Sequence, residues 1–325
     1  MSISKAAKNR IAITVMAVLT LFLIVSFVGG AYLLKVGVGA PSEENRSYQG
    51  SLERMAKDYP GIMPWYDSLM ACNAMGELTM LNRDSVQLHS VYIPARDTTR
   101  ATALIVHGYS DTPMDMLQIA YLYHHDLGYN VFLPDLFAHG KSQGDHVQMG
   151  FRDRLDVLEW IPIADSLFGG GTVMVVHGIS MGGATTMGVA GEDTPPMVKC
   201  FVEDCGFTSV WDEFRHKLKE MYGLPPFPLL YTADILCQWK YGWSFHEASP
   251  VEAVRRAKLP MLFIHGDADR YVPSWMHRPL YEACTSPKGI FVAKGSKHGK
   301  AYRDHPGEYT QVVRDFLAPY INTEK

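Results

Sequence analysis

The sequence predicts an α/β fold: a mostly parallel, doubly wound sheet with a small helical insertion, preceded by one transmembrane helix. Short apolar runs alternate with amphipathic helical stretches through most of the 325 residues, as expected of layered α/β proteins. A long uncharged run near the N-terminus is the second observation. With 47% hydrophobic and 20% charged residues, the chain has the composition of a globular protein that buries a large core.

The uncharged run covers residues 11–34. It exceeds the ~20 residues needed to cross the hydrocarbon core of a bilayer, and it lacks the polar face of a helix that packs on a soluble protein. Lys5, Lys8 and Arg10 precede the run, and two glutamates follow it. By the positive-inside rule we expect residues 1–10 in the cytoplasm and the bulk of the chain outside, in the periplasm or the extracellular space.

A cleaved signal peptide is the alternative interpretation of this run. Signal peptides have a shorter hydrophobic region, and the best small-residue cleavage site here, Val38–Ala40, is followed by Pro41, which suits cleavage poorly. We therefore expect a retained signal-anchor helix, and a secreted protein if the segment is cleaved. Residues 35–50 are expected to form a linker, and residues 51–325 one catalytic domain.

The predicted sheet consists of a hairpin and a series of apolar runs. The hairpin covers about Leu78–Ile93, with its turn at Asn82–Asp84. The runs that follow are rich in β-branched residues, as in strands buried on both faces of a parallel sheet. They cover residues 103–106, 131–133, 173–176, 198–202, 261–264 and 290–292. Amphipathic helices are predicted at about 114–127, 152–167, 181–189 and 306–320.

The interval from about Ser209 to Lys258 contains no strand-like run. It is rich in aromatic residues and is interrupted by Pro225, Pro226 and Pro228. Such an insertion over the carboxyl edge of the sheet would form a small helical lid. Its aromatic side chains either line a substrate pocket or pack the lid onto the body, and the sequence favours neither.

The strongest motif is GISMG at Gly178–Gly182, directly after the run 173–176 and directly before a predicted helix. This is the G-x-S-x-G nucleophile elbow in the strand–turn–helix context that it requires. The turn is so tight that the positions two before and two after the serine need small residues. It lifts the hydroxyl out of the sheet to the N-terminus of the next helix, where N–H groups stabilise an anion. Ser180 is therefore the predicted nucleophile.

A serine hydroxyl needs a base beside it and a carboxylate that orients the base, and in this arrangement they follow in the order serine, acid, histidine. Two carboxylates follow the run 261–264. Asp267 lies in the tight turn, whereas Asp269 precedes a proline-terminated loop and is better placed to reach a histidine, so Asp269 is the favoured acid. Of the three histidines that follow, only His298 lies in a small-residue loop after the last strand, which makes it the predicted base.

Two backbone N–H groups are expected to bind the oxyanion. One belongs to Met181, the residue after the nucleophile, and the other to Tyr109, in the loop after the run 103–106. Each such donor contributes about 10²–10³ in rate. Donation by the Tyr109 hydroxyl is the less favoured alternative. The segment Asp135–Ser142 is expected to shape a loop near the site without taking part in the chemistry.

Other kinds of site have little support in the sequence. A formal net charge of −4 without a basic stripe argues against a nucleic-acid partner. Neither a GxGxxG motif nor a P-loop occurs, so no cofactor is expected. The five cysteines include no CxxC pair, so free packed thiols are expected instead of a metal site. The pair His124–His125 is expected to be solvated at a helix end.

The stretch from about Ala101 to Tyr320 resembles the α/β-hydrolases, and most closely the bacterial esterase-like members related to the prolyl oligopeptidase catalytic domain. The resemblance lies in HGYSDTP at 107–113, DLFAHGKSQG at 135–144, HGISMGG at 177–183, EDCGFTS at 203–209, HGDADRYVP at 265–273 and GSKHG at 295–299. It implies cofactor-free attack on an acyl carbonyl, an acyl-enzyme and hydrolysis by water. Phe137 stands where many relatives have arginine, so an anionic substrate is not implied.

The leading hypothesis is therefore a carboxylic-ester hydrolase that acts on a small or medium acyl substrate outside the cytoplasm. A peptidase or amidase would use the same residues against a poorer leaving group, and an acyltransferase would deliver the acyl group to an alcohol. A non-catalytic scaffold on a hydrolase fold is the alternative from another class. The complete set Ser180, Asp269 and His298 argues against it, and Ser180 argues against hydrolases with an aspartate nucleophile. Substrate identity and oligomeric state stay open.

Overall fold

The computed structural model describes residues 4–321, which form two compact units. The smaller unit comprises the residues up to 39 together with residues 214–247. The larger unit comprises residues 40–213 and those from 248 onward. Residues 1–3 of the predicted cytoplasmic segment lie outside the described part of the chain.

The larger unit is built on an eight-stranded sheet with the strand order β1-β2-β4-β3-β5-β6-β7-β8. β2 pairs antiparallel with both β1 and β4, and the other neighbouring strands are parallel. The strands are β1 (Gly76–Leu81), β2 (Gln87–Ile93), β3 (Ala101–Val106), β4 (Asn130–Pro134), β5 (Val173–Ile179), β6 (Val198–Asp204), β7 (Met261–Gly266) and β8 (Lys288–Ala293). The predicted hairpin and all the predicted apolar runs are confirmed as strands.

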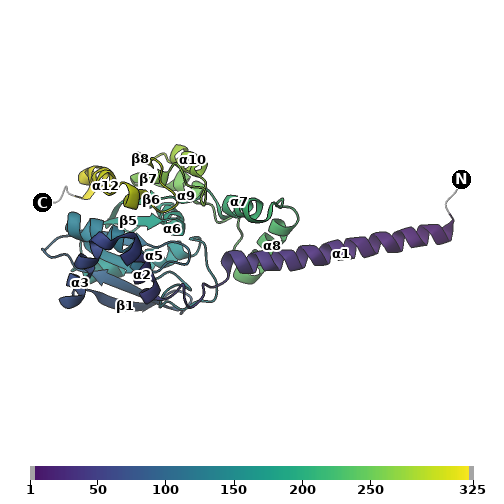
Figure 1. Cartoon of the computed structure of the whole chain (residues 1–325), viewed down its shortest axis with the longest axis horizontal. Coiled ribbons are helices and arrows are strands. Elements are labelled where there is room, and N and C mark those ends of the chain that lie inside the picture. The colour runs from purple at the N-terminus through teal and green to yellow at the C-terminus, as the bar shows by residue number, and fades with distance from the viewer. Residues whose placement is uncertain (1–3, 322–325) are drawn as a thin grey trace. The chain divides into compact units, whose positions relative to one another are not determined.

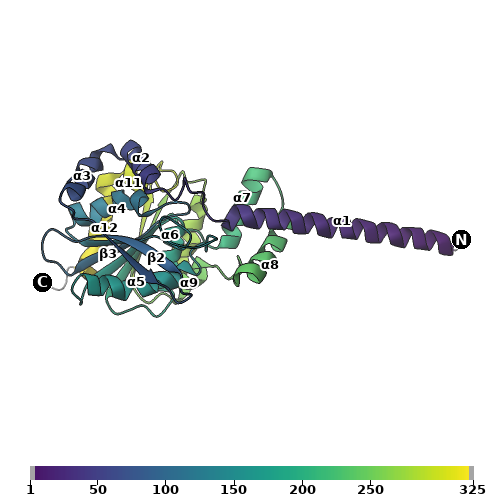
Figure 2. The same ribbon diagram turned by 90° about the horizontal axis from the view of Figure 1, so that it is seen from below.

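Helices cover both faces of this sheet (Figure 2). One face carries α2 (Tyr48–Asp58), η1 (Pro60–Ile62), α3 (Met63–Ala71), η2 (Pro113–Met116), α4 (Leu117–Tyr121), the π-helical turn η3 (Leu122–Asp126), α11 (Ala301–Asp304) and α12 (Pro306–Ile321). The other carries α5 (Asp153–Leu167), α6 (Met181–Ala190), α9 (Pro250–Arg256), η4 (Ser274–Met276) and α10 (His277–Ala283). The helices predicted near 152–167, 181–189 and 306–320 are confirmed, whereas α2 and α3 were not predicted.

The parallel strands place the loops of the candidate site at one edge of the sheet. Strands β3 to β8 run in the same direction, so their carboxyl ends meet there. Ligands of open α/β sheets bind in the crevice beyond these ends. The loops that follow β3, β5, β7 and β8 carry Tyr109, Ser180, Asp269 and His298 respectively.

The expectation of a solvated histidine pair is wrong for His124. Its ring is buried, with Nδ1 3.1 Å from Nε1 of Trp65 and Nε2 3.1 Å from the carbonyl oxygen of Pro94. The indole N–H donates to Nδ1, so Nε2 carries the proton and donates to the carbonyl. Trp65 lies on α3, and without that helix the sequence offered no partner for His124. The neighbouring His125 is exposed and lies 2.7 Å from Asp126 Oδ1.

The smaller unit contains α1 (Lys5–Val38), most of α7 (Val210–Tyr222) and α8 (Leu229–Tyr241) (Figure 1). By length and composition, α1 is able to cross a membrane, a test that a signal sequence also passes. Its buried residues are Ser26, Gly30, Leu34 and Val38. They recur every fourth position and so share one helix face, and α8 packs along α1. The predicted linker 35–50 begins inside α1 and ends inside α2.

Candidate active site

Ser180 lies at a sharp elbow between β5 and α6. Its backbone has φ 59° and ψ −119°, a conformation that a residue with a side chain rarely adopts. Glycines flank it because a Cβ atom at Gly178 would overlap the carbonyl oxygen of Gly182, and one at Gly182 would overlap that of Val106. The Ser180 N–H donates to the carbonyl of Asp204 at 2.8 Å, which ties the elbow to β6. The local fold thus holds the hydroxyl at the carboxyl edge of the sheet.

The structure brings the three predicted residues together in one hydrogen-bonded chain. Nε2 of His298 lies 2.8 Å from Oγ of Ser180, and Nδ1 lies 2.7 Å from Oδ2 of Asp269. An ionised carboxylate only accepts hydrogen bonds, so Nδ1 carries the ring proton and Nε2 is left to accept from the serine hydroxyl. This is the geometry that a serine needs in order to lose its proton as it attacks.

Asp269 is held ionised and fixed in orientation. Its Oδ1 accepts the N–H groups of Tyr271 at 2.8 Å and Val272 at 3.1 Å, while Oδ2 faces His298. Burial raises the pKa of Asp269, but hydrogen bonds from His265 and His298 outweigh burial and lower it to about 2. The competing carboxylate of Asp267 is exposed and accepts the N–H of Gly295 at 2.6 Å. Of the two aspartates, Asp269 is the one hydrogen-bonded to His298.

The two residues expected to donate to the oxyanion are Met181, directly after Ser180, and Tyr109, in the loop after β3. Met181 is the first residue of α6, where backbone N–H groups have no partner within the helix. Tyr109 follows β3 and lines the same cleft as Ser180. Beside Tyr109, Ser110 has a φ of 59°, so the loop turns sharply at this point.

A buried histidine fixes the backbone of this loop. The N–H of Ser110 donates to Nε2 of His139 at 3.2 Å, and Nδ1 of His139 lies 2.9 Å from the carbonyl oxygen of Phe137. Burial, followed by repulsion from His107, lowers the pKa of His139 to about 3, so its ring is neutral and Nε2 is an acceptor. The predicted loop 135–142 therefore holds the chain next to Tyr109, a role that the motif alone did not specify.

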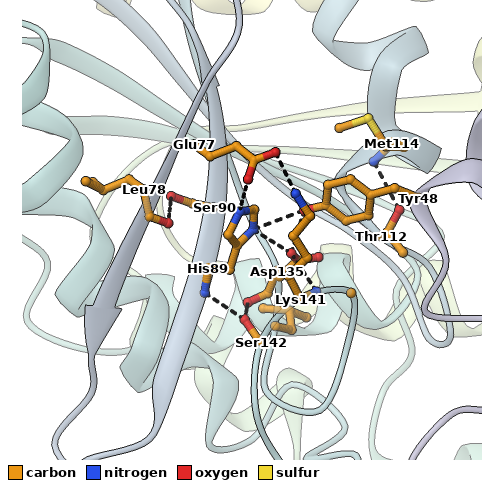
Figure 3. Close-up of polar contacts among 12 residues, drawn as sticks. Tyr48, Glu77, Leu78, His89, Ser90, Thr112, Met114, Asp135, Lys141 and Ser142 are labelled. Carbon is orange, nitrogen blue, oxygen red and sulfur yellow. Dashed lines mark hydrogen bonds and ion pairs between the residues drawn. The ribbon is translucent and has the colours of Figure 1, made fainter. Parts of the chain in front are cut away.

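A polar network holds the loop 135–142 in place (Figure 3). Oδ2 of Asp135 lies 2.6 Å from the Tyr48 hydroxyl, 2.9 Å from Nδ1 of His89 and 3.1 Å from the N–H of Lys141. Glu77 lies 3.0 Å from Nε2 of His89 and 2.6 Å from Nζ of Lys141. Burial lowers the pKa of His89, but Asp135 and Glu77 outweigh burial and raise it. The sequence contains no short motif for this network, because its members come from α2, β1, β2 and the loop after β4.

Ser180 and His298 open onto a cleft of about 270 Å³. Its wall includes residues of α2 that sequence reasoning missed, namely Arg54, Met55 and Asp58. The cations in this wall are paired. Arg54 contacts the Asp115 carboxylate through two nitrogens, each at 3.0 Å, and Nζ of Lys300 lies 2.7 Å from Oδ2 of Asp58. Each of these two cations is thus paired with a carboxylate.

One further carboxylate, Asp111, lines the cleft. Burial, followed by repulsion from Asp115, raises the pKa of Asp111 to about 7. Its carboxylate lies close to Gly108, where an added Cβ atom would approach Oδ2 to 2.7 Å. A glycine at position 108 therefore leaves room for Asp111 beside the loop that carries Tyr109.

Within residues 4–321, one group of side chains has the spacing of metal ligands: Cys205, Asp269 and His298, whose ligand atoms lie within 4.8 Å of one another. Burial raises the pKa of the Cys205 thiol well above its ordinary value, so the thiol stays protonated. Zinc binds the thiolate form, and the other two groups are already hydrogen-bonded to each other. Asp269 and His298 of this group are therefore engaged with each other, and Cys205 offers no thiolate beside them.

A mostly parallel sheet with a serine on the strand–helix elbow is the architecture of the α/β-hydrolases. The chain matches the prolyl oligopeptidase family over residues 138–324 and belongs to that family. It is 29% identical to the uncharacterized protein YqkD of Bacillus subtilis over 226 residues, which cover 70% of this chain and 74% of YqkD.

Two solved structures illustrate the shared fold. The esterase Pf2001 of Pyrococcus furiosus is 20% identical, with a TM-score of 0.61, over 76% of this chain and 93% of the esterase. The acylaminoacyl peptidase of Pyrococcus horikoshii is 16% identical, with a TM-score of 0.59, over 80% of this chain and 44% of the peptidase. The chain therefore has a serine-hydrolase type of fold related to those of esterases and acylaminoacyl peptidases.

Proposed function

We propose that the chain is a serine hydrolase that cleaves a carboxylic ester of a small or medium acyl substrate. One observation carries the proposal: the continuous hydrogen bonds from Asp269 through His298 to Oγ of Ser180, with Ser180 and His298 lining a cleft. A base within hydrogen-bond reach of the nucleophile, itself oriented by a third group, is the signature of covalent catalysis by serine.

In the proposed mechanism, Oγ of Ser180 attacks the ester carbonyl carbon while Nε2 of His298 takes the hydroxyl proton. The oxyanion binds the N–H groups of Tyr109 and Met181. When the C–O bond to the leaving alcohol breaks, His298 donates the proton to that oxygen, and an acyl-enzyme is left. Water then attacks the acyl-enzyme with His298 as base, which releases the acid and restores Ser180. Asp269 stays ionised throughout and stabilises the imidazolium.

The size and charge of the cleft support the substrate class. Its volume of about 270 Å³ lies just below the range of about 300–1,000 Å³ that is usual for ligand pockets, which favours a small substrate. The paired charges of its wall offer no surplus cation for an anionic substrate. A peptidase or amidase is the second candidate, favoured by the likeness to the acylaminoacyl peptidase and by membership of the prolyl oligopeptidase family.

We further propose that α1 is a retained membrane anchor, with the N-terminus in the cytoplasm and the catalytic unit outside. The length and apolar composition of α1 support the span. The basic residues Lys5, Lys8 and Arg10 ahead of the run support this orientation.

Covalent labelling by a fluorophosphonate tests the proposed chemistry. The full chain in detergent should be labelled, and Ser180→Ala, which keeps the fold but lacks the hydroxyl, should not. A screen of p-nitrophenyl esters of graded chain length against aminoacyl anilides then separates the ester hydrolase from the amidase. A folded wild-type chain that takes up no label would overturn the mechanism and favour a non-catalytic scaffold.

A further inference from the structure

The smaller unit presents a continuous apolar stripe to its surroundings. The stripe consists of large side chains at every fourth position on and just before α8: Phe227, Tyr231, Ile235 and Trp239, which are 63%, 46%, 67% and 84% exposed. Residues four apart lie on one face of a helix, so these side chains form one row. The buried residues of α8, Leu230, Ala233 and Cys237, lie at other positions and form the packed face. Large exposed apolar rows of this kind mark interaction surfaces.

The segment that carries the stripe is almost free of charge. Between Gly223 and Trp239 the single charged residue is Asp234. Its carboxylate is used internally, because Oδ1 accepts the N–H of Phe245 at 2.5 Å and Oδ2 lies 2.7 Å from Nδ1 of His246. The single carboxylate of this segment is therefore turned towards partners within the smaller unit.

Residues from α7 to the start of α8 contact α1 at successive positions, from its C-terminal end towards its middle. Phe214, on α7, faces Gly37 at the end of α1, where an added Cβ atom would lie 3.0 Å from the ring. Phe227, at the opposite end of this contact surface, has its ring centroid 6.2 Å from that of Phe22. At about 1.5 Å per residue, Gly37 and Phe22 are about 22 Å apart along the helix axis.

Two further contacts lie between these two positions on α1. A Cβ atom at Gly30 would lie 2.7 Å from Cβ of Thr232, and one at Gly29 would lie 2.6 Å from Cδ2 of Leu229. Small residues of this kind allow close packing between helices inside a bilayer. The first turn of α8 is thus packed tightly against the second half of α1.

These contacts determine the depth of the stripe once α1 spans a bilayer. Phe22 lies near the middle of the uncharged run 11–34, and the hydrocarbon core is about 30 Å thick. A bilayer centred on that run therefore surrounds Phe227 near its middle and the start of α8 in its outer half. In water, by contrast, Phe227 would expose 63% of its surface.

The backbone between α7 and α8 suits a site without water. The segment 223–228 joins α7 to α8 and contains three prolines, which lack an N–H: Pro225, Pro226 and Pro228. The N–H of Gly223 donates to the carbonyl of Lys219 at 3.0 Å, and those of Leu230 and Thr232 donate to Pro226 and Pro228 at 2.8 and 3.0 Å. Non-helical backbone in hydrocarbon is costly when its polar groups lack partners, and here few donors are left to satisfy.

We propose that the segment 223–239 is a membrane wedge, inserted beside α1 into the leaflet on the catalytic side, with the start of its apolar stripe, at Phe227 and Tyr231, against the lipid acyl chains. The inference rests on the anchor proposed for α1 and is independent of the hydrolase chemistry. The charged part of α7, with Lys217, Lys219 and Glu220, would lie at the headgroups. The wedge would thereby fix the smaller unit to the membrane at two segments instead of one.

Tryptophan fluorescence in lipid vesicles tests the wedge. The full chain is reconstituted into phosphatidylcholine vesicles, with or without bromine at the middle of the acyl chains. The probe is Phe227→Trp, and the matched control is Leu81→Trp, at a position on β1 that is 69% exposed. The emission of each added indole is obtained as the difference from wild type. Far-UV circular dichroism that matches the wild type shows that both variants fold.

For Phe227→Trp we expect blue-shifted emission that loses most of its intensity to brominated lipid and resists aqueous iodide. For Leu81→Trp we expect the reverse. An indole at 227 quenched by iodide, in protein that alkaline carbonate leaves in the vesicles, would overturn the wedge while the anchor stands. An indole that neither quencher reaches would show that protein, such as a second copy, covers the stripe, and would also overturn the wedge. Release of the chain by carbonate would remove the anchor, and the wedge with it.

Discussion

The substitution Asp269→Asn tests the proposed orientation of the base, because the structure determines how the new amide would lie. In the wild type, Oδ1 accepts two backbone N–H groups, those of Tyr271 and Val272. Only the carbonyl oxygen of the asparagine can take that place. The NH₂ group must then replace Oδ2, 2.7 Å from Nδ1 of His298.

An NH₂ group donates, so Nδ1 would have to accept and the ring proton would move to Nε2. That atom lies 2.8 Å from Oγ of Ser180 and could no longer take the serine proton. The same change of tautomer costs about 10⁴ in kcat in the chymotrypsin triad. We expect a loss of about 10³–10⁴ in kcat/KM, or about 4–5.5 kcal/mol at about 1.4 kcal/mol per tenfold.

The assay is the second-order rate of fluorophosphonate labelling, followed by hydrolysis of whichever p-nitrophenyl ester is cleaved fastest. The matched control is Asp267→Asn, two residues away. Asp267 is exposed and accepts the N–H of Gly295, which an amide carbonyl also does. We expect its rate to stay within about twofold of wild type, as for most surface substitutions.

Either of two results would refute this reasoning. A folded Asp269→Asn variant that keeps a tenth or more of the activity would mean that the carboxylate does not set the tautomer of His298. A large loss in Asp267→Asn with little loss in Asp269→Asn would assign the acid to the other carboxylate. Circular dichroism of both variants separates these results from unfolding.

Three further predictions concern the surroundings of the site. His139→Ala removes the acceptor for the N–H of Ser110 and thereby loosens the loop of the proposed oxyanion donor Tyr109, so kcat should fall about 10-fold with little change in KM. His139→Gln should recover part of the loss. Equal losses in both variants would contradict a positioning role for His139. Burial raises the pKa of Glu203 to about 8, so the stability that this group contributes is complete below about pH 4 and is lost as the pH rises towards 8. In urea titrations, Glu203→Gln should therefore lose less stability than wild type between pH 5 and 9, by at least about 1 kcal/mol, and parallel losses would show that Glu203 ionises normally. Cys72 is the exposed cysteine among five, so a native titration with a thiol reagent should modify Cys72 alone, and a mass spectrum that shows another modified thiol would contradict the packing.

The parts of the site carried by local motifs were predictable from sequence. The elbow at Ser180 needs glycines two positions away on either side, and this steric demand is visible in five consecutive residues. The choice of His298 followed from its place in a loop after the last strand. Both inferences depend on order along the chain, which the parallel sheet converts into proximity at one edge.

The wall of the cleft was not predictable in the same way. Asp58 and Lys300 are 242 positions apart, yet their side chains meet at 2.7 Å. α2 is a short helix without a motif, and its place over the cleft depends on packing against η2 and η1. Long-range pairs of this kind leave no periodic signal in the chain. For the same reason the sequence offered no partner for His124.

The backbone at Ser180 has a consequence for how such an enzyme changes over generations. A side chain at φ 59° and ψ −119° costs about 1–3 kcal/mol, and glycine would relieve most of that cost. The substitution Ser180→Gly would thus favour persistence of the folded chain while it abolished turnover. Under the proposed mechanism, the chemistry of Ser180 is what would keep serine at this position although glycine gives the more stable fold. A lineage that no longer needs to hydrolyse its substrate should lose this serine early, and its folded state would become more stable.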